Sequence, residues 1–245
     1  MKKKIIIDMP LNTITYFNQR NNFKGLTKDW LEYRIDLFMK YTYKCLINQT
    51  DQDFLCVIHY MQQTENIINE ILSKYPKLPI NVVFSSDGDN LIKSSLQGYD
   101  YVYKLRLDSD NIIHPSFVAQ LKKVDYREGL QCIIGRWGYV YDAVTNRLAW
   151  WNHDSSAFNS YVYKVKEYLQ NNFMASTEPE YHMVAVNLNH DFLFANHDDG
   201  RSYIILVHGK NLQNEFDEIV SSNLCPGIIE DEELKATILK DFKIV

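Results

Sequence analysis

Strand-like and helix-like segments alternate along residues 1–111, and this alternation is the feature that most restricts the fold. β-rich apolar runs predict strands at 54–60, 80–84 and 101–107. A first strand is expected at either 5–8 or 11–17. Helical spacing of apolar residues predicts helices that follow Thr27, open at Thr64 and cover 91–96. This order predicts an α/β fold with a mostly parallel sheet and helices on both faces.

The second half of the sequence is less regular. A helix is expected over 117–124, and strands are expected at 130–134, 138–142 and 203–208. A turn at Asn146-Arg147 predicts a hairpin to a strand at 148–152, and residues 230–242 predict a charged helix. The sequence has no internal repeat and no Ser/Gly/Pro linker, so residues 1–245 are expected to form a single domain.

Charge and hydropathy exclude several classes of protein. The formal net charge is −5 and the pI about 5.8, so no basic surface for general nucleic-acid binding is expected. No apolar run reaches the roughly 18 residues of a membrane span. Asp8 and Pro10 interrupt the apolar start, so no signal peptide is expected, and the four cysteines are too widely spaced for a disulfide framework. These features predict a cytoplasmic protein without a transmembrane segment, and they leave peripheral contact with a membrane open.

Asp-x-Asp is the chemical motif that remains once other motifs are excluded. The sequence contains no GxGxxG, no GxxxxGK[ST], no GxSxG and no HExxH. Asp-x-Asp occurs three times, at residues 51–53, 87–89 and 108–110. The first lies between a helix and a strand start, and in the second Gly88 indicates a turn. The third directly follows the predicted strand 101–107, where parallel sheets bind their ligands.

Asp108 and Asp110 are therefore the candidate metal ligands. Two carboxylates at positions i and i+2 of an extended backbone lie on one face and can hold a hard divalent cation. Such a cation would neutralise a diphosphate. The alternative is that residues 108–111 only cap the following helix.

Three longer segments resemble the putative rhamnosyltransferase family. Residues 30–38 (WLEYRIDLF) and 45–54 (CLINQTDQDF) are similar to its "R-x-x-L-F … L-x-x-Q-T-D-x-D-F" signature. Residues 106–111 (RLDSDN) resemble its "R-x-D-x-D-[DN]" metal motif, and residues 203–211 (YIILVHGKN) resemble its late "W-x-x-x-x-H-G-x-N" strand. Members of this family are glycosyltransferases with a GT-A fold.

The resemblance implies a division of labour and a set of roles. Residues 1–111 would form the nucleotide-sugar-binding half, and residues 112–245 the acceptor side. Asp108 would contact the ribose or a metal-bound water, Asp110 would ligate Mg²⁺ or Mn²⁺, and His208 would be a further ligand or a diphosphate contact. The alternative for His208 is a satisfied core histidine. The expected partners are a dTDP- or UDP-sugar donor and a glycan acceptor.

Cations and a further carboxylate are expected near the donor. Lys104 and Arg106 share one face of their strand, and either could offset diphosphate charge, although a solvated edge or a structural ion pair would also explain them. Asp87, in the loop after the strand at 80–84, is a further candidate for contacting the cofactor.

The catalytic base is sought in the second half. Inverting transfer needs a carboxylate that deprotonates the acceptor hydroxyl, and Glu178 is the first candidate, with Glu180 and Asp154 in reserve. For each of them a surface carboxylate is the simpler interpretation. Trp150 or Trp151 could stack on an acceptor sugar, but adjacent strand residues point to opposite faces, so only one can face a cleft.

Two enzymatic hypotheses and one non-enzymatic hypothesis follow. The first is a metal-dependent, inverting glycosyltransferase, with rhamnose from dTDP-L-rhamnose as the donor sugar that the family name implies. The second keeps the fold and uses a UDP-hexose. The third is a carbohydrate- or cation-binding protein with a degenerate site.

Overall fold

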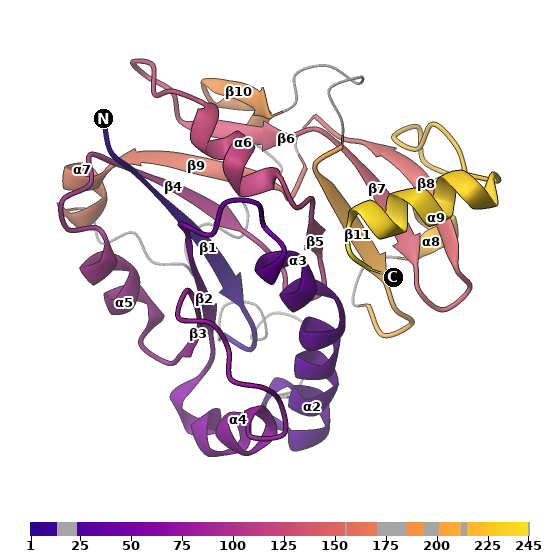
Figure 1. Ribbon diagram of the computed structural model, residues 1–245, viewed down its shortest axis with the longest axis horizontal. Coiled ribbons are helices and arrows are strands. Elements are labelled where there is room, and N and C mark those ends of the chain that lie inside the picture. The colour runs from indigo at the N-terminus through magenta and orange to yellow at the C-terminus, as the bar shows by residue number, and fades with distance from the viewer. Residues whose placement is uncertain (14–23, 155, 171–184, 194–200, 212–214, 245) are drawn as a thin grey trace.

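The computed structural model describes residues 1–13, 24–154, 156–170, 185–193, 201–211 and 215–244. Two sheets organise these residues (Figure 1). The larger has seven strands in the order β10-β6-β9-β4-β1-β2-β3, and the smaller has four in the order β5-β11-β7-β8.

The first four strands form a continuous parallel block of the large sheet. They are β1 (Lys3–Pro10), β2 (Leu55–His59), β3 (Val82–Ser85) and β4 (Tyr101–Arg106). β1 pairs with both β2 and β4 in parallel, and β2 pairs with β3 in parallel. The strand at 3–10 confirms the first of the two predicted starts. Of the alternative start at 11–17, residues 14–17 lie outside the described part of the chain.

Helices and short helical turns connect these strands. They are η1 (Lys24–Leu26), α2 (Lys28–Leu37), the π-helical turn η2 (Phe38–Thr42), α3 (Tyr43–Ile47), η3 (Gln62–Thr64), α4 (Glu65–Leu72) and α5 (Gly88–Ser95). Thr27 and Thr64 occupy the N-cap positions of α2 and α4, as the sequence predicts. The π-helical turn between α2 and α3 was not predicted.

Apolar side chains of β1 alternate between two covered faces of the large sheet. Ile5, Ile7 and Met9 belong to the main core, which also contains buried side chains from α2, α4 and the helix α6 (Phe117–Lys123). Ile6 packs on the other face with residues from α5 and from α7 (Val165–Gln170). Burial on both faces is typical of a central parallel strand. The predicted α/β fold, with helices on both faces of a mostly parallel sheet, is confirmed.

The second half of the chain contributes to both sheets. It adds β6 (Cys132–Gly135), β9 (Asn159–Lys164) and β10 (His190–Leu193) to the large sheet. β9 runs antiparallel to both β4 and β6, whereas β10 is parallel to β6. This antiparallel insertion beside β4 was not predicted, and it makes the sheet mixed.

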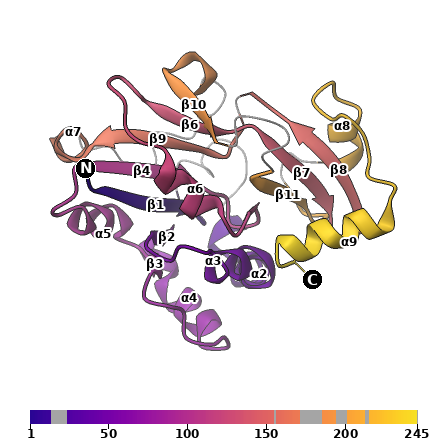
Figure 2. The ribbon, with the colours of Figure 1, turned by 45° about the horizontal axis from the view of Figure 1, so that its top comes forward.

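The small sheet contains the predicted hairpin and the late strand. Its strands are β5 (Ile112–Ile113), β7 (Trp137–Asp142), β8 (Arg147–Asn152) and β11 (Tyr203–Val207). β7 and β8 pair antiparallel, and β11 runs parallel to β7. Two further helices are α8 (Phe216–Val220) and α9 (Glu232–Asp241). Figures 1 and 2 both show α9 beside this sheet, and Phe242 at its end packs on Tyr139.

One local prediction needs correction. Gly88 does not mark a turn before a helix at 91–96; it is the first residue of α5, with Asp87 at the N-cap position. The reason is packing, because a Cβ atom on Gly88 would approach the His59 ring without space for it. A glycine therefore lets the start of α5 lie directly against the end of β2. No helix in the described part of the chain is long and apolar enough to cross a membrane.

Candidate active site

The Asp-Ser-Asp motif lies in the loop between β4 of the large sheet and β5 of the small sheet. β4 ends at Arg106, Leu107 still donates its backbone N–H to the Asp8 carbonyl of β1, and β5 begins at Ile112. The loop thus begins at the carboxyl ends of the parallel strands β1 and β4, as predicted. The backbone N–H of Asn111 donates to the Asp108 carbonyl at 3.1 Å, so residues 108–111 form a turn. This corrects the expectation of an extended backbone with both carboxylates on one face.

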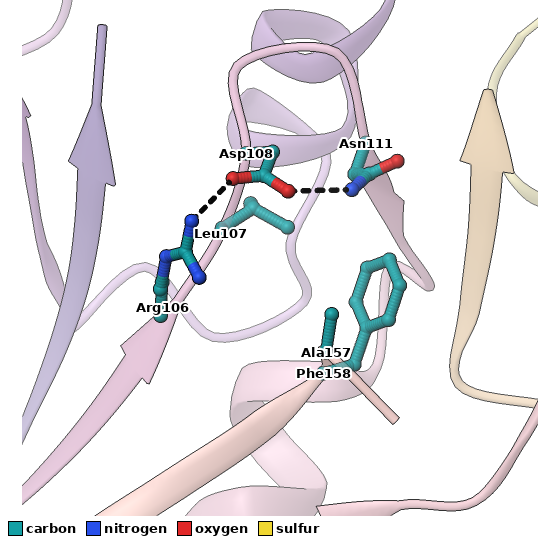
Figure 3. A pocket seen from close by; sticks show the side chains of 6 residues that line it. All are labelled: Arg106, Leu107, Asp108, Asn111, Ala157 and Phe158. Atoms are coloured by element: carbon teal, nitrogen blue, oxygen red, sulfur yellow. Dashed lines mark hydrogen bonds and ion pairs between the residues drawn. The ribbon is translucent and has the colours of Figure 1, made fainter. Parts of the chain in front are cut away.

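Asp108 lines a small pocket beside this loop. The lining residues are Arg106, Leu107, Asp108, Asn111, Ala157 and Phe158 (Figure 3). Nη2 of Arg106 lies 3.3 Å from one Asp108 carboxylate oxygen, and the Asn111 side-chain amide lies 3.5 Å from the other. The Asp108 side chain is 31% exposed, so its carboxylate is accessible from the pocket. The structure therefore brings together the candidates Arg106 and Asp108.

Asp110 has a different environment. Its Oδ2 accepts from Nη1 of Arg34 at 2.8 Å and lies 3.0 Å from Nε2 of His208. Burial alone would raise the pKa of Asp110, but the charge of Arg34 and the hydrogen bonds from His208 and Arg34 lower the pKa to about 2. The carboxylate is therefore ionised at neutral pH. The structure brings the candidates Asp110 and His208 into direct contact.

His208 follows β11 and uses both ring nitrogens within the protein. Nε2 faces Asp110, and Nδ1 lies 2.7 Å from the hydroxyl of Tyr33 in α2. The backbone N–H of His208 donates to the side-chain carbonyl of Asn211 at 2.7 Å. In this arrangement His208 contacts a proposed metal ligand, and its own ligation of a metal stays a prediction.

Side chains of α2 and η2 also contact the Asp-Ser-Asp loop. Nη2 of Arg34 donates to the Ser109 hydroxyl at 2.6 Å. The Thr42 hydroxyl lies 3.0 Å from the Ser109 carbonyl and 2.9 Å from the Asn111 carbonyl. Thr42 is the last residue of the π-helical turn, a feature often found at functional sites. Sequence reasoning gave no role to Tyr33, Arg34 or Thr42; the position of Arg34 in the family signature was the available signal.

Lys104 lies in the interior of the protein. Its side chain is 1% exposed, and Nζ lies 2.9 Å from Oδ2 of Asp8. The other carboxylate oxygen of Asp8 lies 2.6 Å from Nε2 of His59. Burial would raise the pKa of Asp8, but Lys104 and His59 outweigh burial and hold it well below its usual range. The structural ion pair, one of the two alternatives for Lys104, is what the structure shows.

Asp87 has a local structural role in the structure. It is exposed at the start of α5, where its carboxylate accepts from the Asn90 side-chain amide at 2.8 Å. A contact with the nucleotide donor stays a prediction for Asp87.

The candidates for the catalytic base are Glu178, Glu180 and Asp154. Glu178 and Glu180 fall outside the described residues. The reserve candidate Asp154 is exposed, and its carboxylate pairs with Arg136 at 2.5 Å. Such a carboxylate fits the surface interpretation, and its role as a base stays a prediction.

The two tryptophans have separate environments. Trp150 packs against Tyr139, and the guanidinium of Arg201 lies 4.2 Å from the centre of its ring. Trp151 stacks instead with His153.

The donor atoms around the Asp-Ser-Asp loop suit a hard cation. Carboxylate oxygens are the ligands that Mg²⁺ and Mn²⁺ prefer. Asp108 has an accessible carboxylate, and the described contacts of Asp110 use Oδ2, which leaves Oδ1 for a ligand. Within the described ranges, no group of three or more His, Cys, Asp or Glu side chains is arranged to hold a metal ion. A cation here would therefore need ligands from water or from the diphosphate as well.

Comparisons with known proteins give one family and several distant structures. A family model described as putative rhamnosyl transferase matches residues 20–134. No curated protein matches the sequence. Solved structures similar to the chain include a cytidylyltransferase from Leptospira borgpetersenii, with 13% identity, a TM-score of 0.37 and coverage of 78% of this chain and 75% of that one.

A structure of S. aureus TarS 1-349 is also similar, with 14% identity, a TM-score of 0.37 and coverage of 83% of this chain. The chain spans 60% of the length of that TarS structure. The family match includes Arg34 of α2 and the whole Asp-Ser-Asp loop. The resemblance is thus confirmed over residues 20–134, the part of the chain that is similar to the family described as putative rhamnosyl transferase.

Proposed function

We propose that the protein transfers a sugar from a nucleotide-activated donor to a hydroxyl group of a glycan or another acceptor. The observation that carries this proposal is the position of Asp108-Ser109-Asp110, inside the family match and directly after the central strand β4. Parallel sheets bind ligands at this edge. The adjacent side chains of Arg106 and Asp108 support a donor site there, because a guanidinium can offset diphosphate charge and a carboxylate can hold a metal or a ribose.

We propose Mn²⁺ or Mg²⁺ as the cofactor, held by Asp108 and by Oδ1 of Asp110. A bound cation would neutralise the diphosphate as the glycosidic bond to the leaving group breaks. Rhamnose from dTDP-L-rhamnose is the donor sugar that the family description supports, and a UDP-hexose is the alternative. The reaction is proposed to invert the anomeric centre, with Glu178 as the base that removes the acceptor proton.

The experiment is a binding and turnover screen on the full chain. Thermal-shift measurements with dTDP, UDP, GDP and CDP, with and without MnCl₂, identify which nucleotide binds, because a ligand that binds the folded state raises its stability. Release of nucleoside diphosphate from the matching nucleotide sugar then measures turnover with and without EDTA. Asp110→Ala is expected to abolish turnover and to leave the protein folded. Failure of every nucleotide to bind would favour the non-catalytic alternative.

Turnover of a Glu178 variant tests the proposed catalytic base, and NMR of the product tests the stereochemistry. Glu178→Gln is expected to lower kcat by about 10²–10⁴-fold at unchanged donor affinity. A fully active Glu178→Gln enzyme would move the role to Glu180 or Asp154. NMR of the product linkage would overturn the proposed mechanism if the anomeric configuration is retained.

A further inference from the structure

We propose that two consecutive residues of α2, Tyr33 and Arg34, are positioning residues for the Asp110 carboxylate. Arg34 acts on Asp110 directly, and Tyr33 acts through His208. The inference rests on the proposed function, because it explains how Asp110 is held ready to bind a cation and a nucleoside diphosphate.

Arg34 joins two side chains of the Asp-Ser-Asp loop. Nη1 lies 2.8 Å from Oδ2 of Asp110, and Nη2 lies 2.6 Å from the Ser109 hydroxyl. The Arg34 side chain is 17% exposed and that of Asp110 is 12% exposed, so water screens this ion pair little. A planar guanidinium that contacts two groups fixes their separation and their orientation. A lysine ammonium supplies the charge without this fork, so it cannot replace that geometry.

Two donors from different parts of the fold meet at the same oxygen of Asp110. Arg34 approaches Oδ2 from α2, and His208 approaches it from the end of β11. β11 pairs with β5, the strand into which the loop leads, and Figure 1 shows these two strands side by side. With Oδ2 held from two directions, rotation of the carboxylate would break at least one contact. The other oxygen, Oδ1, is thereby kept in a defined position for a ligand.

Tyr33 holds the His208 ring on the side opposite Asp110. Nε2 faces the Asp110 carboxylate, which can only accept, so Nε2 must be the protonated nitrogen. On the other side of the ring, the Tyr33 hydroxyl lies 2.7 Å from Nδ1 and 3.2 Å from the His208 backbone carbonyl, so Tyr33 contacts both the ring and the main chain of His208. The ammonium of Lys210 lies 4.2 Å from the centre of the Tyr33 ring and helps to hold it. Tyr33 thus keeps the His208 ring oriented with Nε2 toward Asp110.

The test measures binding of UDP and of dTDP in the presence of MnCl₂ by isothermal titration calorimetry on full-length variants. Partners that orient a metal ligand typically contribute 10–100-fold to affinity, so Arg34→Lys is expected to weaken binding by about that factor. Tyr33→Phe removes a single oxygen atom and is expected to weaken binding by roughly 10-fold. The matched control is Glu32→Gln on the same helix, which pairs with Lys74 and is expected to bind like the wild type.

A double-variant experiment separates positioning from a structural role. If Tyr33 acts through His208, Tyr33→Phe has no further effect on affinity in a His208→Gln protein, whereas independent roles would add. Melting temperatures of all variants are compared with that of Glu32→Gln. A drop in melting temperature with unchanged affinity would overturn the inference, and Tyr33→Phe keeps it testable if Arg34→Lys fails to fold.

Failure of this inference is distinguishable from failure of the proposed function. Wild-type affinity in Asp110→Asn would show that Asp110 holds no cation, and the proposed metal site would fall. Loss of binding in Asp110→Asn with wild-type affinity in both Arg34→Lys and Tyr33→Phe would leave the metal site standing and overturn the positioning roles. If Arg34→Ala weakens binding and Arg34→Lys binds like the wild type, the charge of Arg34 alone would account for its effect on affinity.

Discussion

Replacing Lys104 by methionine is expected to lower the free energy of unfolding rather than to weaken donor binding. Lys104 and Asp8 are buried side by side, with side chains 1% and 4% exposed and charged atoms 2.9 Å apart. Methionine has a similar length and volume, so the substitution removes the charge and creates little empty space. It leaves the Asp8 carboxylate buried with His59 as its remaining described partner.

The expected loss is large because the buried charge loses its main partner. At 2.9 Å the attraction is about 6 kcal/mol with an effective dielectric constant of about 20. Desolvation of both groups already offsets much of this in the wild type, and breaking one partner of a buried pair typically costs about 3–5 kcal/mol. We therefore expect the free energy of unfolding at pH 7.5 to fall by about 3–5 kcal/mol.

The loss should depend on pH in a defined direction. In the wild type the pKa of Asp8 is depressed, so its stabilising contribution is complete above the unfolded carboxyl pKa and is lost as the pH falls toward the folded value. In Lys104→Met the opposing effect of burial is no longer outweighed by Lys104, so the pKa of Asp8 rises. Protonation then removes the uncompensated charge, and the gap between variant and wild type narrows from pH 7.5 to pH 4.5.

Urea denaturation followed by circular dichroism measures these differences. The matched control is Lys164→Met on the neighbouring strand β9, whose ion pair with Glu128 is exposed, and little change in stability is expected there. Two results would refute the reasoning. One is a loss no greater than that of Lys164→Met. The other is normal stability with weakened nucleotide binding, which would return Lys104 to the donor site.

Three further predictions concern packing, capping and thiol reactivity. Gly88→Ala should lower the free energy of unfolding by about 1–3 kcal/mol in urea denaturation, because the new Cβ meets the ring of His59, and wild-type stability would contradict this. Asp231→Ala should lower it by about 1 kcal/mol, because the Asp231 carboxylate caps two backbone N–H groups of α9, and an unchanged urea midpoint would argue against the cap. Maleimide at pH 8 should label the partly exposed Cys225 in the native protein, whereas Cys45, whose pKa burial raises to about 12, should react only after unfolding, and mass spectrometry of labelled peptides decides between them.

The sequence predicts the parallel half of the fold well because its signals are local. β1, β2 and β3 are short apolar runs, and the helices α2 and α4 between them have threonine at their N-cap positions, so each feature is readable within a few residues. The antiparallel insertion of β9 between β4 and β6 could not be predicted in this way. Strand order beyond the repeating unit depends on contacts between distant segments, which spacing along one sequence does not show.

Lys104 shows where strand periodicity stops being informative. Its parity with Arg106 predicts a shared face correctly, but it cannot say whether that face is covered. Arg106 lies at the end of β4 and lines the pocket, whereas Lys104 lies two residues earlier, beside Asp8 of β1. Two basic side chains on one strand face can therefore have different environments, one beside a pocket and the other in an interior ion pair.

Strand periodicity is also insufficient for the Asp-Ser-Asp loop of the candidate site. An extended backbone would give Asp108 and Asp110 equivalent positions, but the turn closed by the Asn111 N–H separates their environments. Asp108 stays accessible beside Arg106, whereas Asp110 is held by Arg34 and His208, which lie 76 and 98 residues away in the sequence.

The partners distinguish the two carboxylates: that of Asp108 is accessible beside Arg106, whereas that of Asp110 is held by Arg34 and His208. Holding the Asp110 carboxylate in one orientation costs conformational entropy. The packing of helix α2 and strand β11 in the folded protein offsets this loss before a ligand binds. Preorganisation of this kind would suit a diphosphate site, because a cation held there would meet the charge of the leaving group with one of its ligands already in place.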